Sequence, residues 1–255
     1  MKLPTGLLIV LPRSSQFGSE AYVTHANVDL GAEALLARMA DESRDFLDIG
    51  ANIGYYSLYL APCVRRVYAF EPDDRCLSTL RANARIARNV AVVAQAVSAH
   101  SGLVRFDVSD GTEFSHIAEG GEREVMATSV DDFVATTGAD VGLIKIDVEG
   151  HDLSVLLGAR KTLRETHALV LTEFSQPDDG VNSTDALHEI CAALDYEIYG
   201  HAYAHDGNPA HATLCRMDAI DERGISKMLF LVPPRLHARF AREASLEDRV
   251  RVGEP

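Results

Sequence analysis

The segment FLDIGANIGYYSLYLA, residues 46–61, carries an acidic residue and two glycines in a short turn after an apolar stretch. Asp48 lies in that stretch close to its end, and Gly50 and Gly54 follow it. Glycine adopts positive φ angles readily and lets a backbone come close to a ligand. Because ligands bind beyond the carboxyl ends of the strands in open α/β sheets, a strand-to-helix turn of this kind predicts a small-molecule site.

An acidic residue also follows the next apolar run, VYAF, where Glu71 comes directly after residues 67–70. A carboxylate at this place can accept hydrogen bonds from both hydroxyls of a ribose, which indicates a nucleoside cofactor. The GxGxxG pattern of nicotinamide-dependent enzymes is missing from the sequence. Asp48 would repel a pyrophosphate but suits a cationic amino group and a positively charged sulfonium. The pattern therefore favours S-adenosylmethionine (SAM), and the alternative is a turn whose glycines serve packing alone.

Further acidic residues end two later apolar runs, at Asp147 and Glu173. Methyl transfer to a hydroxyl requires a proton acceptor, and a positioned carboxylate or histidine can serve. We expect this acceptor among Asp147, His151 and Glu173, with Glu149 as a further candidate. The alternatives are a structural cap at the helix start for Glu149 and an exposed helix start for His151. Asp147 and Glu173 could also bind Mg²⁺, which prefers oxygen ligands, although the pair alone is weak evidence.

The three segments FLDIGANIGYYSLYLA, VYAFEPDDRCLSTLRAN and LIKIDVEGHDLSVLLGA, together with SVDDF at 129–133, resemble the FkbM family of methyltransferases. The resemblance covers residues 44–175. It implies a Rossmann-like class I fold, SAM as cofactor, and O-methylation of a hydroxyl on a small molecule such as a sugar or secondary metabolite. The pair His151-Asp152 departs from the family pattern, which leaves the role of His151 open.

The resemblance also assigns roles within the cofactor site, from the methionine end to the adenine. The residues concerned are Asp48, Gly50 and Asn52 for the methionine end, with Gly54 opening the helix of the same turn, Glu71 for the ribose, Ala96 and Val97 for the adenine, and Asp147 beside the methyl group. Two alternatives from other classes are a non-catalytic SAM-binding subunit and a methyltransferase acting on nitrogen or nucleic acid.

Apolar runs alternate with stretches of helical periodicity along the chain, which predicts an α/β fold with a doubly wound, mostly parallel, seven-stranded sheet. We expect one domain, made of an N-terminal cover (1–44) with a helix near 30–39, a SAM-binding core (45–232) and a charged tail (233–255). The expected strands are 46–49, 67–70, 90–94, 104–108, 141–146, 168–171 and 228–232, and the expected helices include 54–61, one after Asp73 or Asp74, one from Asp152 and one around 187–194.

The composition limits the classes of partner that the protein is expected to bind. The net charge of −14 disfavours a large surface for nucleic-acid phosphates, and no apolar run approaches the ~20 residues of a membrane span. The opening segment MKLPTGLLIVLP predicts a buried strand rather than a signal peptide, because Pro4 and Pro12 interrupt it. Four separate cysteines without a CxxC pair fit reduced thiols. We therefore expect a cytoplasmic enzyme with a small hydroxyl acceptor, without nucleic-acid or membrane partners; a homo-oligomer stays open.

Histidines gather in two expected loops. His116 lies in the stretch 110–122, and His201, His205 and His211 lie in the stretch 200–215. The later group has metal-like spacing, but no convincing set of further ligands accompanies it. We expect both loops to border the acceptor and to determine which molecule is methylated.

Overall fold

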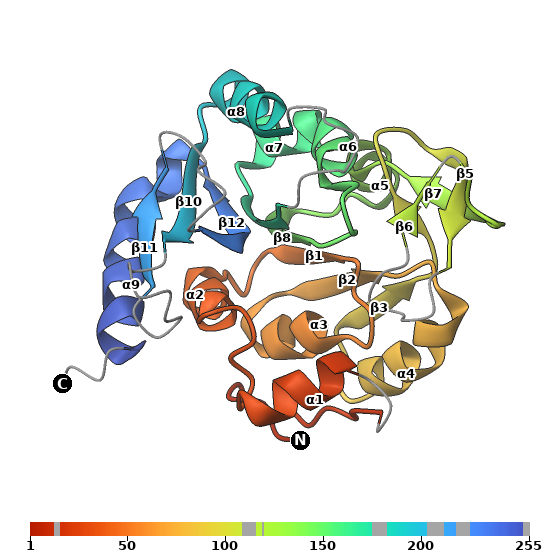
Figure 1. The fold of residues 1–255 in the computed structure, drawn as a ribbon, viewed down its shortest axis with the longest axis horizontal. Coiled ribbons are helices and arrows are strands. Elements are labelled where there is room, and N and C mark those ends of the chain that lie inside the picture. Colours follow the sequence, from red (N-terminus) through yellow and green to blue (C-terminus); the bar gives the residue numbers. More distant parts are fainter. Residues whose placement is uncertain are drawn as a thin grey trace.

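The structure is a computed structural model that describes residues 1–12, 16–108, 116–118, 120–174, 183–202, 212–217 and 225–251. Its main sheet has eight strands in the order β11-β10-β12-β9-β8-β1-β2-β3 (Figure 1). These strands are β1 (Asp45–Ile49), β2 (Arg66–Phe70), β3 (Val90–Val93), β8 (Val141–Ile146), β9 (Leu169–Glu173), β10 (Glu197–Ala202), β11 (Thr213–Arg216) and β12 (Ile225–Val232).

The sheet is mixed. Strands β3, β2, β1, β8 and β9 run parallel, whereas β12 is antiparallel to both β9 and β10, and β10 is antiparallel to β11. The expected count of seven strands was therefore wrong for this sheet. Neither β10 nor the edge strand β11 was predicted from the sequence. Strand β11 is short and follows a polar, histidine-containing segment. After β3 the chain returns to place β8 beside β1, so the strand order reverses between these two strands.

Helices cover both faces of the sheet (Figure 1). One face is covered by α1 (Gln16–Val23), α2 (Ala32–Met39), α3 (Tyr55–Leu60), α4 (Asp74–Ala84) and α9 (His237–Arg251); the other is covered by α5 (Val130–Thr137), α6 (Asp152–Leu157), α7 (Arg160–Thr166) and α8 (Ser183–Leu194). Phe46 and Leu47 are neighbours in β1, and they pack into opposite core clusters. Strands buried on both faces are apolar almost throughout, which is why the runs were legible in the sequence.

A second, four-stranded sheet stands beside the β3 edge, in the order β4-β7-β5-β6. Its strands are β4 (Ala96–Val97), β5 (Gly102–Asp107), β6 (His116–Ile117) and β7 (Arg123–Thr128). The expected strand at 104–108 belongs to this sheet as β5. Strand β6 lies within the stretch 110–122 that was expected to be a loop, and residues 109–115 lie outside the described part of the chain.

The first residues form a compact turn instead of the expected strand. A single bridge joins Lys2 to Leu8, and the N-terminal amino group donates to the carbonyl oxygen of Ile9 at 2.9 Å. Leu3 and Ile9 are 2% exposed and so are buried as expected, whereas Leu8 and Val10 are 59% and 54% exposed, and the backbone turns back at Gly6. The tail is helical in η4 (Pro234–Leu236) and α9. The division into cover, core and tail stays a prediction.

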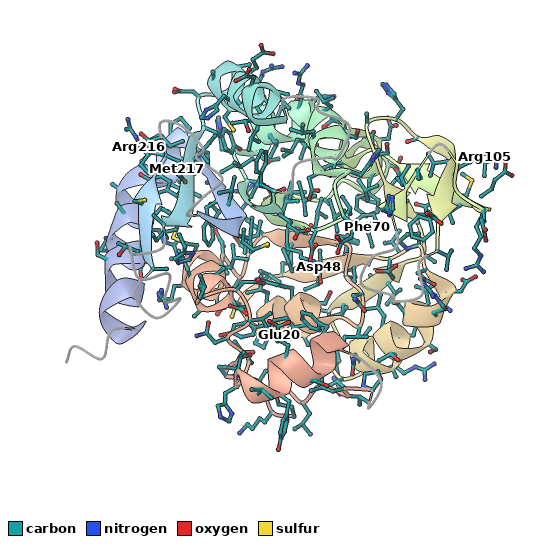
Figure 2. The ribbon with its side chains drawn as sticks, viewed as in Figure 1. Glu20, Asp48, Phe70, Arg105, Arg216 and Met217 are labelled. Carbon is teal, nitrogen blue, oxygen red and sulfur yellow. The ribbon has the colours of Figure 1, made fainter. Side chains whose placement is uncertain are left out.

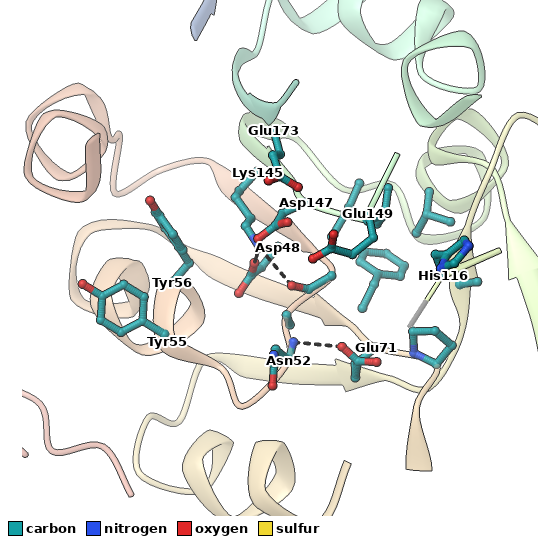
Figure 3. Close-up of a pocket in the computed structure, with 18 of the residues that line it drawn as sticks. Asp48, Asn52, Tyr55, Tyr56, Glu71, His116, Lys145, Asp147, Glu149 and Glu173 are labelled. Carbon is teal, nitrogen blue, oxygen red and sulfur yellow. Dashed lines mark hydrogen bonds and ion pairs between the residues drawn. The ribbon is translucent and has the colours of Figure 1, made fainter. Parts of the chain in front are cut away.

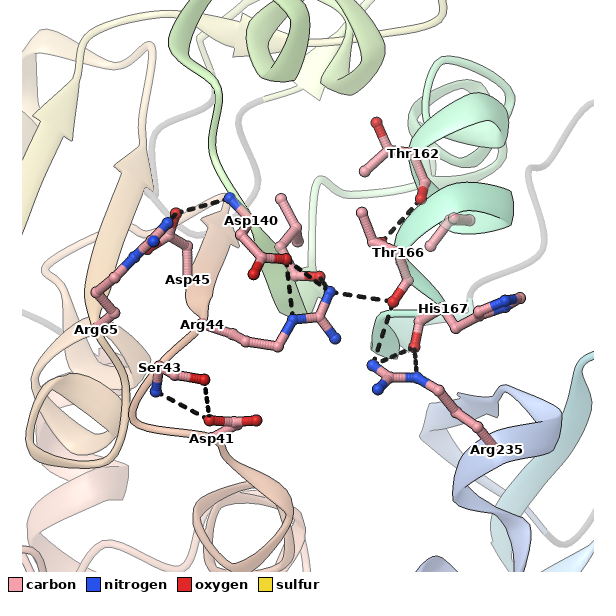
Figure 4. Close-up of polar contacts among 12 residues, drawn as sticks. Asp41, Ser43, Arg44, Asp45, Arg65, Asp140, Thr162, Thr166, His167 and Arg235 are labelled. Carbon is pink, nitrogen blue, oxygen red and sulfur yellow. Dashed lines mark hydrogen bonds and ion pairs between the residues drawn. The ribbon is translucent and has the colours of Figure 1, made fainter.

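Arginines fasten the edge of the sheet where the central strands begin (Figure 4). Arg44 donates from Nε to Asp140 at 3.0 Å and from its guanidinium to the carbonyl oxygens of Val141 and Thr166. Arg235 donates to the carbonyl oxygen of His167 at 3.1 Å. These bonds satisfy carbonyl groups at the end of α7 that the helix itself cannot pair. The candidate site lies at the opposite, carboxyl ends of these strands. Among the described helices, none is long and apolar enough to cross a membrane.

Candidate active site

A cavity of about 420 Å³ lies at the carboxyl ends of the central strands (Figure 3). This volume is in the range of small-molecule and cofactor pockets. Its walls come from the turn between β1 and α3, the ends of β2, β8 and β9, the side sheet, and the N-terminal helices. The polar and charged lining residues are Glu20, Asp29, Asp48, Asn52, Tyr55, Tyr56, Glu71, Gln95, His116, Lys145, Asp147, Glu149 and Glu173.

The glycine turn has a clear steric reason. Gly50 and Gly54 have φ angles of 75° and 87°, and Asn52 between them is also left-handed, at 49°. A Cβ on Gly50 would lie 1.8 Å from the carbonyl oxygen of Asp147, and one on Gly54 would lie 2.8 Å from Leu80. The turn can therefore accept no side chain at Gly50, and Gly54 allows helix α3 to pack on α4. Gly54 shapes the turn without lining the cavity.

Glu71 is fixed by the backbone around it. Its two carboxylate oxygens accept from the N–H of Asn52 at 2.9 Å and from the N–H of Asp73 at 2.8 Å. Burial raises the pKa of Glu71 to about 7 despite these bonds. An ionised carboxylate has about four acceptor positions, so two remain for a ligand. The expectation that Asp73 caps α4 is correct, since its side chain accepts from the N–H of Arg75.

Lys145 links the two motif segments, and the sequence analysis did not identify it. Its Nζ donates to the carbonyl oxygen of Gly50 at 2.9 Å and lies 3.0 Å from Oδ2 of Asp147 and 3.9 Å from Oδ1 of Asp48. Burial favours the neutral amine, but the two carboxylates prevail and raise the pKa of Lys145 above its usual value. A lysine inside an apolar strand run was the signal that could have found it, because a buried ammonium requires partners.

Asp48 is completely buried, and Figure 2 shows it near the centre of the molecule. Ser57 on α3 donates to its Oδ2 at 2.5 Å. Burial raises the pKa of Asp48, while Lys145 opposes the shift. Oδ1 accepts no hydrogen bond from the described part of the chain. A buried acceptor of this kind on a cavity wall is suited to a polar ligand.

Three carboxylates lie together where β8 and β9 end. One oxygen from each of Asp147, Glu149 and Glu173 falls within a group whose members are all within 4.8 Å of one another (Figure 3). Glu149 has a φ of 53°, which turns the chain sharply after β8. Such a group can accept a proton or bind a divalent cation. The structure thus brings together the predicted Asp147 and Glu173, with Glu149 beside them.

The N-terminal cover contributes acidic residues that were not predicted from the sequence, among them Asp29 and Glu33. Asp29 lines the cavity and accepts from the hydroxyl of Tyr56 at 2.6 Å, and the buried Glu33 accepts from the hydroxyl of Tyr55 at 2.9 Å. Burial raises the pKa of Asp29 to about 6 and that of Glu33 to about 7. The ring of Tyr56 in turn lies 5.5 Å from the Nζ of Lys145. The cover is therefore joined to the centre of the site.

His151 is placed away from the cavity wall. Its Nε2 lies 2.9 Å from the Oγ of Ser98, and burial lowers the pKa of the ring. The cavity is lined instead by His116 from β6, with Ala96 and Val97 from β4. His201 is buried in β10, whereas His205 and His211 lie outside the described residues.

The strand order, the glycine turn after β1 and the carboxylate after β2 together define a methyltransferase of class I architecture. Residues 48–199 match the methyltransferase FkbM domain, which is more than half of the chain. The chain therefore belongs to the FkbM methyltransferase family, and the resemblance seen in the sequence is confirmed.

Two curated relatives and one solved structure illustrate the kinship. The hexuronic acid methyltransferase AglP of Haloferax volcanii is 29% identical over 170 residues, which are 64% of this chain and 69% of the relative. The 2-O-methyltransferase NoeI of Sinorhizobium fredii is 26% identical over 156 residues, 52% of this chain and 63% of the relative. The crystal structure of methyltransferase FkbM from Methylobacillus flagellatus KT aligns with a TM-score of 0.52 at 21% identity. It shares the fold, and the match covers 74% of this chain but 44% of that chain.

Proposed function

We propose that this protein is a SAM-dependent O-methyltransferase that methylates a hydroxyl group of a small molecule, such as a sugar or a secondary metabolite. The observation that carries the proposal is the pairing of a fixed carboxylate after β2 with a group of carboxylates after β8 and β9, across one cavity. Both relatives support it through their names, which specify a hexuronic acid methyltransferase and a 2-O-methyltransferase.

The residues present fit SAM. Glu71 has acceptor positions left for the ribose hydroxyls, and Oδ1 of Asp48 is a buried acceptor suited to the amino group of the methionine part. Ala96 and Val97 are 4% and 2% exposed and offer an apolar wall for the adenine. When bound, SAM supplies an activated methyl group. The roles of Gly50 and Asn52 are to shape the turn that approaches the methionine part.

The protein's part in the transfer is alignment, exclusion of water and acceptance of a proton. Asp147 and Glu173 are the proposed proton acceptors for the attacking hydroxyl. Lys145 forms an ion pair with Asp147 at 3.0 Å and so holds this carboxylate in place at the end of β8. His151, which bonds Ser98, is the weaker candidate, because it does not line the cavity.

The experiment that tests this function is incubation of the purified protein with SAM and a pool of sugars and hydroxylated metabolites, with mass detection of methylated products. We expect a product that carries an added methyl group, and its loss in Asp147→Asn or in Glu173→Gln, whichever residue accepts the proton. SAM binding without any product across the pool would favour the non-catalytic subunit, and methylated amines or nucleic acid would favour the other acceptor classes. Comparing EDTA with Mg²⁺ tests the metal hypothesis, which rests on the carboxylate group alone. Cytoplasmic location and a homo-oligomer also stay predictions.

A further inference from the structure

The charged residues around the cavity are strongly unbalanced. Among the described residues that line it, seven carry carboxyl groups, whereas only Lys145 and His116 are basic. The charge of Lys145 is already matched, because its Nζ lies 3.0 Å from Asp147 and 3.9 Å from Asp48. The cavity therefore presents an acidic interior, in line with the net charge of −14 for the chain.

The acidic residues divide into two groups by position. Asp48 and Glu71 belong to the cofactor side, where their oxygens are bound by Ser57 and by backbone N–H groups. The other five surround the rest of the cavity: Glu20 and Asp29 from the N-terminal cover, and Asp147, Glu149 and Glu173 from the ends of β8 and β9. Figure 3 shows the last three together, across the cavity from Glu71. With the cofactor placed along Asp48 and Glu71 as proposed, this second group lines the part of the cavity that is left for the acceptor.

From this arrangement we infer that this chain, unlike the relative named as a hexuronic acid methyltransferase, takes an acceptor with no acidic group near the methylated hydroxyl, so that an uncharged or amino-bearing sugar is accepted and a uronic acid is rejected. This inference rests on the proposed function. Two like charges a few ångströms apart repel each other, and more strongly near a protein surface than in bulk water, so a carboxylate on the acceptor is disfavoured at each acidic neighbour. An ammonium group at the same place would be attracted.

The test compares related acceptors of different charge: the amino sugar has an ammonium in place of the 2-hydroxyl, and the uronic acid has a carboxylate in place of the C6 hydroxymethyl group. The methyl glycosides of glucose, glucosamine and glucuronic acid, and the same series for galactose and mannose, are incubated with SAM in EDTA, so that no divalent cation offsets the acidic residues. Binding of S-adenosylhomocysteine is measured first on the same protein. We expect at least one neutral or amino sugar to be methylated, with kcat/KM at least about tenfold above that of the matching uronate.

A charge reversal at the rim supplies a second readout. Glu20 lines the cavity from α1 but is exposed, so Glu20→Lys should fold normally, and Figure 2 shows its position on that helix. The ratio of uronate to neutral-sugar turnover should rise roughly fivefold in Glu20→Lys. Glu165→Lys, an exposed reversal on α7 away from the cavity lining, should leave the ratio unchanged.

The results of these experiments distinguish a failure of the inference from a failure of the proposed function. Equal or faster turnover of the uronates, or no turnover of any neutral or amino sugar by a protein that binds S-adenosylhomocysteine, would overturn the inference. An unchanged ratio in Glu20→Lys would contradict its electrostatic basis. Failure to bind S-adenosylhomocysteine would instead remove the proposed function on which the inference depends.

Discussion

The backbone of Gly50 lies against the carbonyl oxygen of Asp147, so closely that a Cβ on Gly50 would be 1.8 Å from that oxygen. The two residues belong to sequence motifs almost a hundred positions apart, and Lys145 binds the carbonyl oxygen of Gly50 and the carboxylate of Asp147 in addition. The turn proposed to hold the cofactor and the loop that carries the candidate proton acceptor are therefore packed together as one unit.

Gly50→Ala should disrupt this unit. Its Cβ would collide with backbone and the φ of 75° would be strained, which together should cost about 3 kcal/mol or more of unfolding free energy. The matched control is Gly138→Ala, since Gly138 has a similar φ of 68° and no atom within 4 Å of an added Cβ. That change should cost about 1–2 kcal/mol. Urea unfolding of both variants makes the comparison, and equal costs would refute the steric argument.

Lys145→Met should be severely destabilising. It removes the ammonium that offsets Asp48 and Asp147 and leaves the buried Asp48 carboxylate uncompensated, a change that typically costs about 3–5 kcal/mol. Lys145→Arg keeps the charge and should recover part of the loss. Thermal unfolding followed by circular dichroism measures the effect. A Lys145→Met protein as stable as the wild type would show that the ion pairs do not hold the site together.

Glu33→Gln should make stability less dependent on pH. Burial raises the pKa of Glu33 to about 7 from 4.5, so between these values the folded chain holds a proton that the unfolded chain has released. The unfolding free energy therefore falls as pH rises through this window. Glutamine keeps the Oε1 acceptor for Tyr55 and cannot ionise. We expect Glu33→Gln to gain at least about 1 kcal/mol over the wild type at pH 8 and little at pH 4.5. The difference in unfolding free energy between Glu33→Gln and the wild type is measured by denaturation at both pH values. An equal difference at pH 8 and pH 4.5 would argue against an ionisable Glu33.

Variants of the three predicted catalytic residues should differ in how strongly they lower kcat. Asp147→Asn and Glu173→Gln remove candidate proton acceptors, and the one that serves should lower kcat by about 10²–10⁴-fold with a small effect on cofactor affinity. His151→Gln should change kcat by less than about threefold, because His151 bonds Ser98 and does not line the cavity. Steady-state kinetics with the identified acceptor decide between them. A large loss in His151→Gln would return that residue to the mechanism.

The parallel half of the sheet was predictable from the sequence, and its remaining strands largely were not. Strands β1, β8 and β9 are buried along most of their length and β2 in part, so each is mainly apolar, with Asp48 and Lys145 as interruptions, and ends in or beside an acidic residue. Strand β10 mixes buried and half-buried residues, β11 has only the short run TLCR, and β6 is two residues long. Such segments become strands through their neighbours, which a local pattern does not contain.

The candidate site divides in the same way. Glycines and acidic residues at strand ends can be recognised by residue type and spacing, so Asp48, Glu71 and Asp147 were predicted. Asp29 reaches the cavity through the packing of the N-terminal cover against α3, and no periodicity indicated this. His151 was a candidate because it follows Glu149 and Gly150, yet the left-handed backbone of both residues redirects the chain before α6 begins. The spacing along the chain placed His151 close to the site, but it could not indicate where the side chain points.

The assignment of the cavity as the SAM site is tested most directly by calorimetric titration of the wild-type protein and Glu71→Ala with S-adenosylhomocysteine. We expect micromolar binding by the wild type and at least about tenfold weaker binding by Glu71→Ala, because hydrogen bonds from the ribose to a carboxylate are each worth about 1.5–3 kcal/mol. A circular dichroism spectrum confirms that the variant is folded. No binding by the wild type, or equal affinity in the folded variant, would contradict the assignment of this cavity as the SAM site.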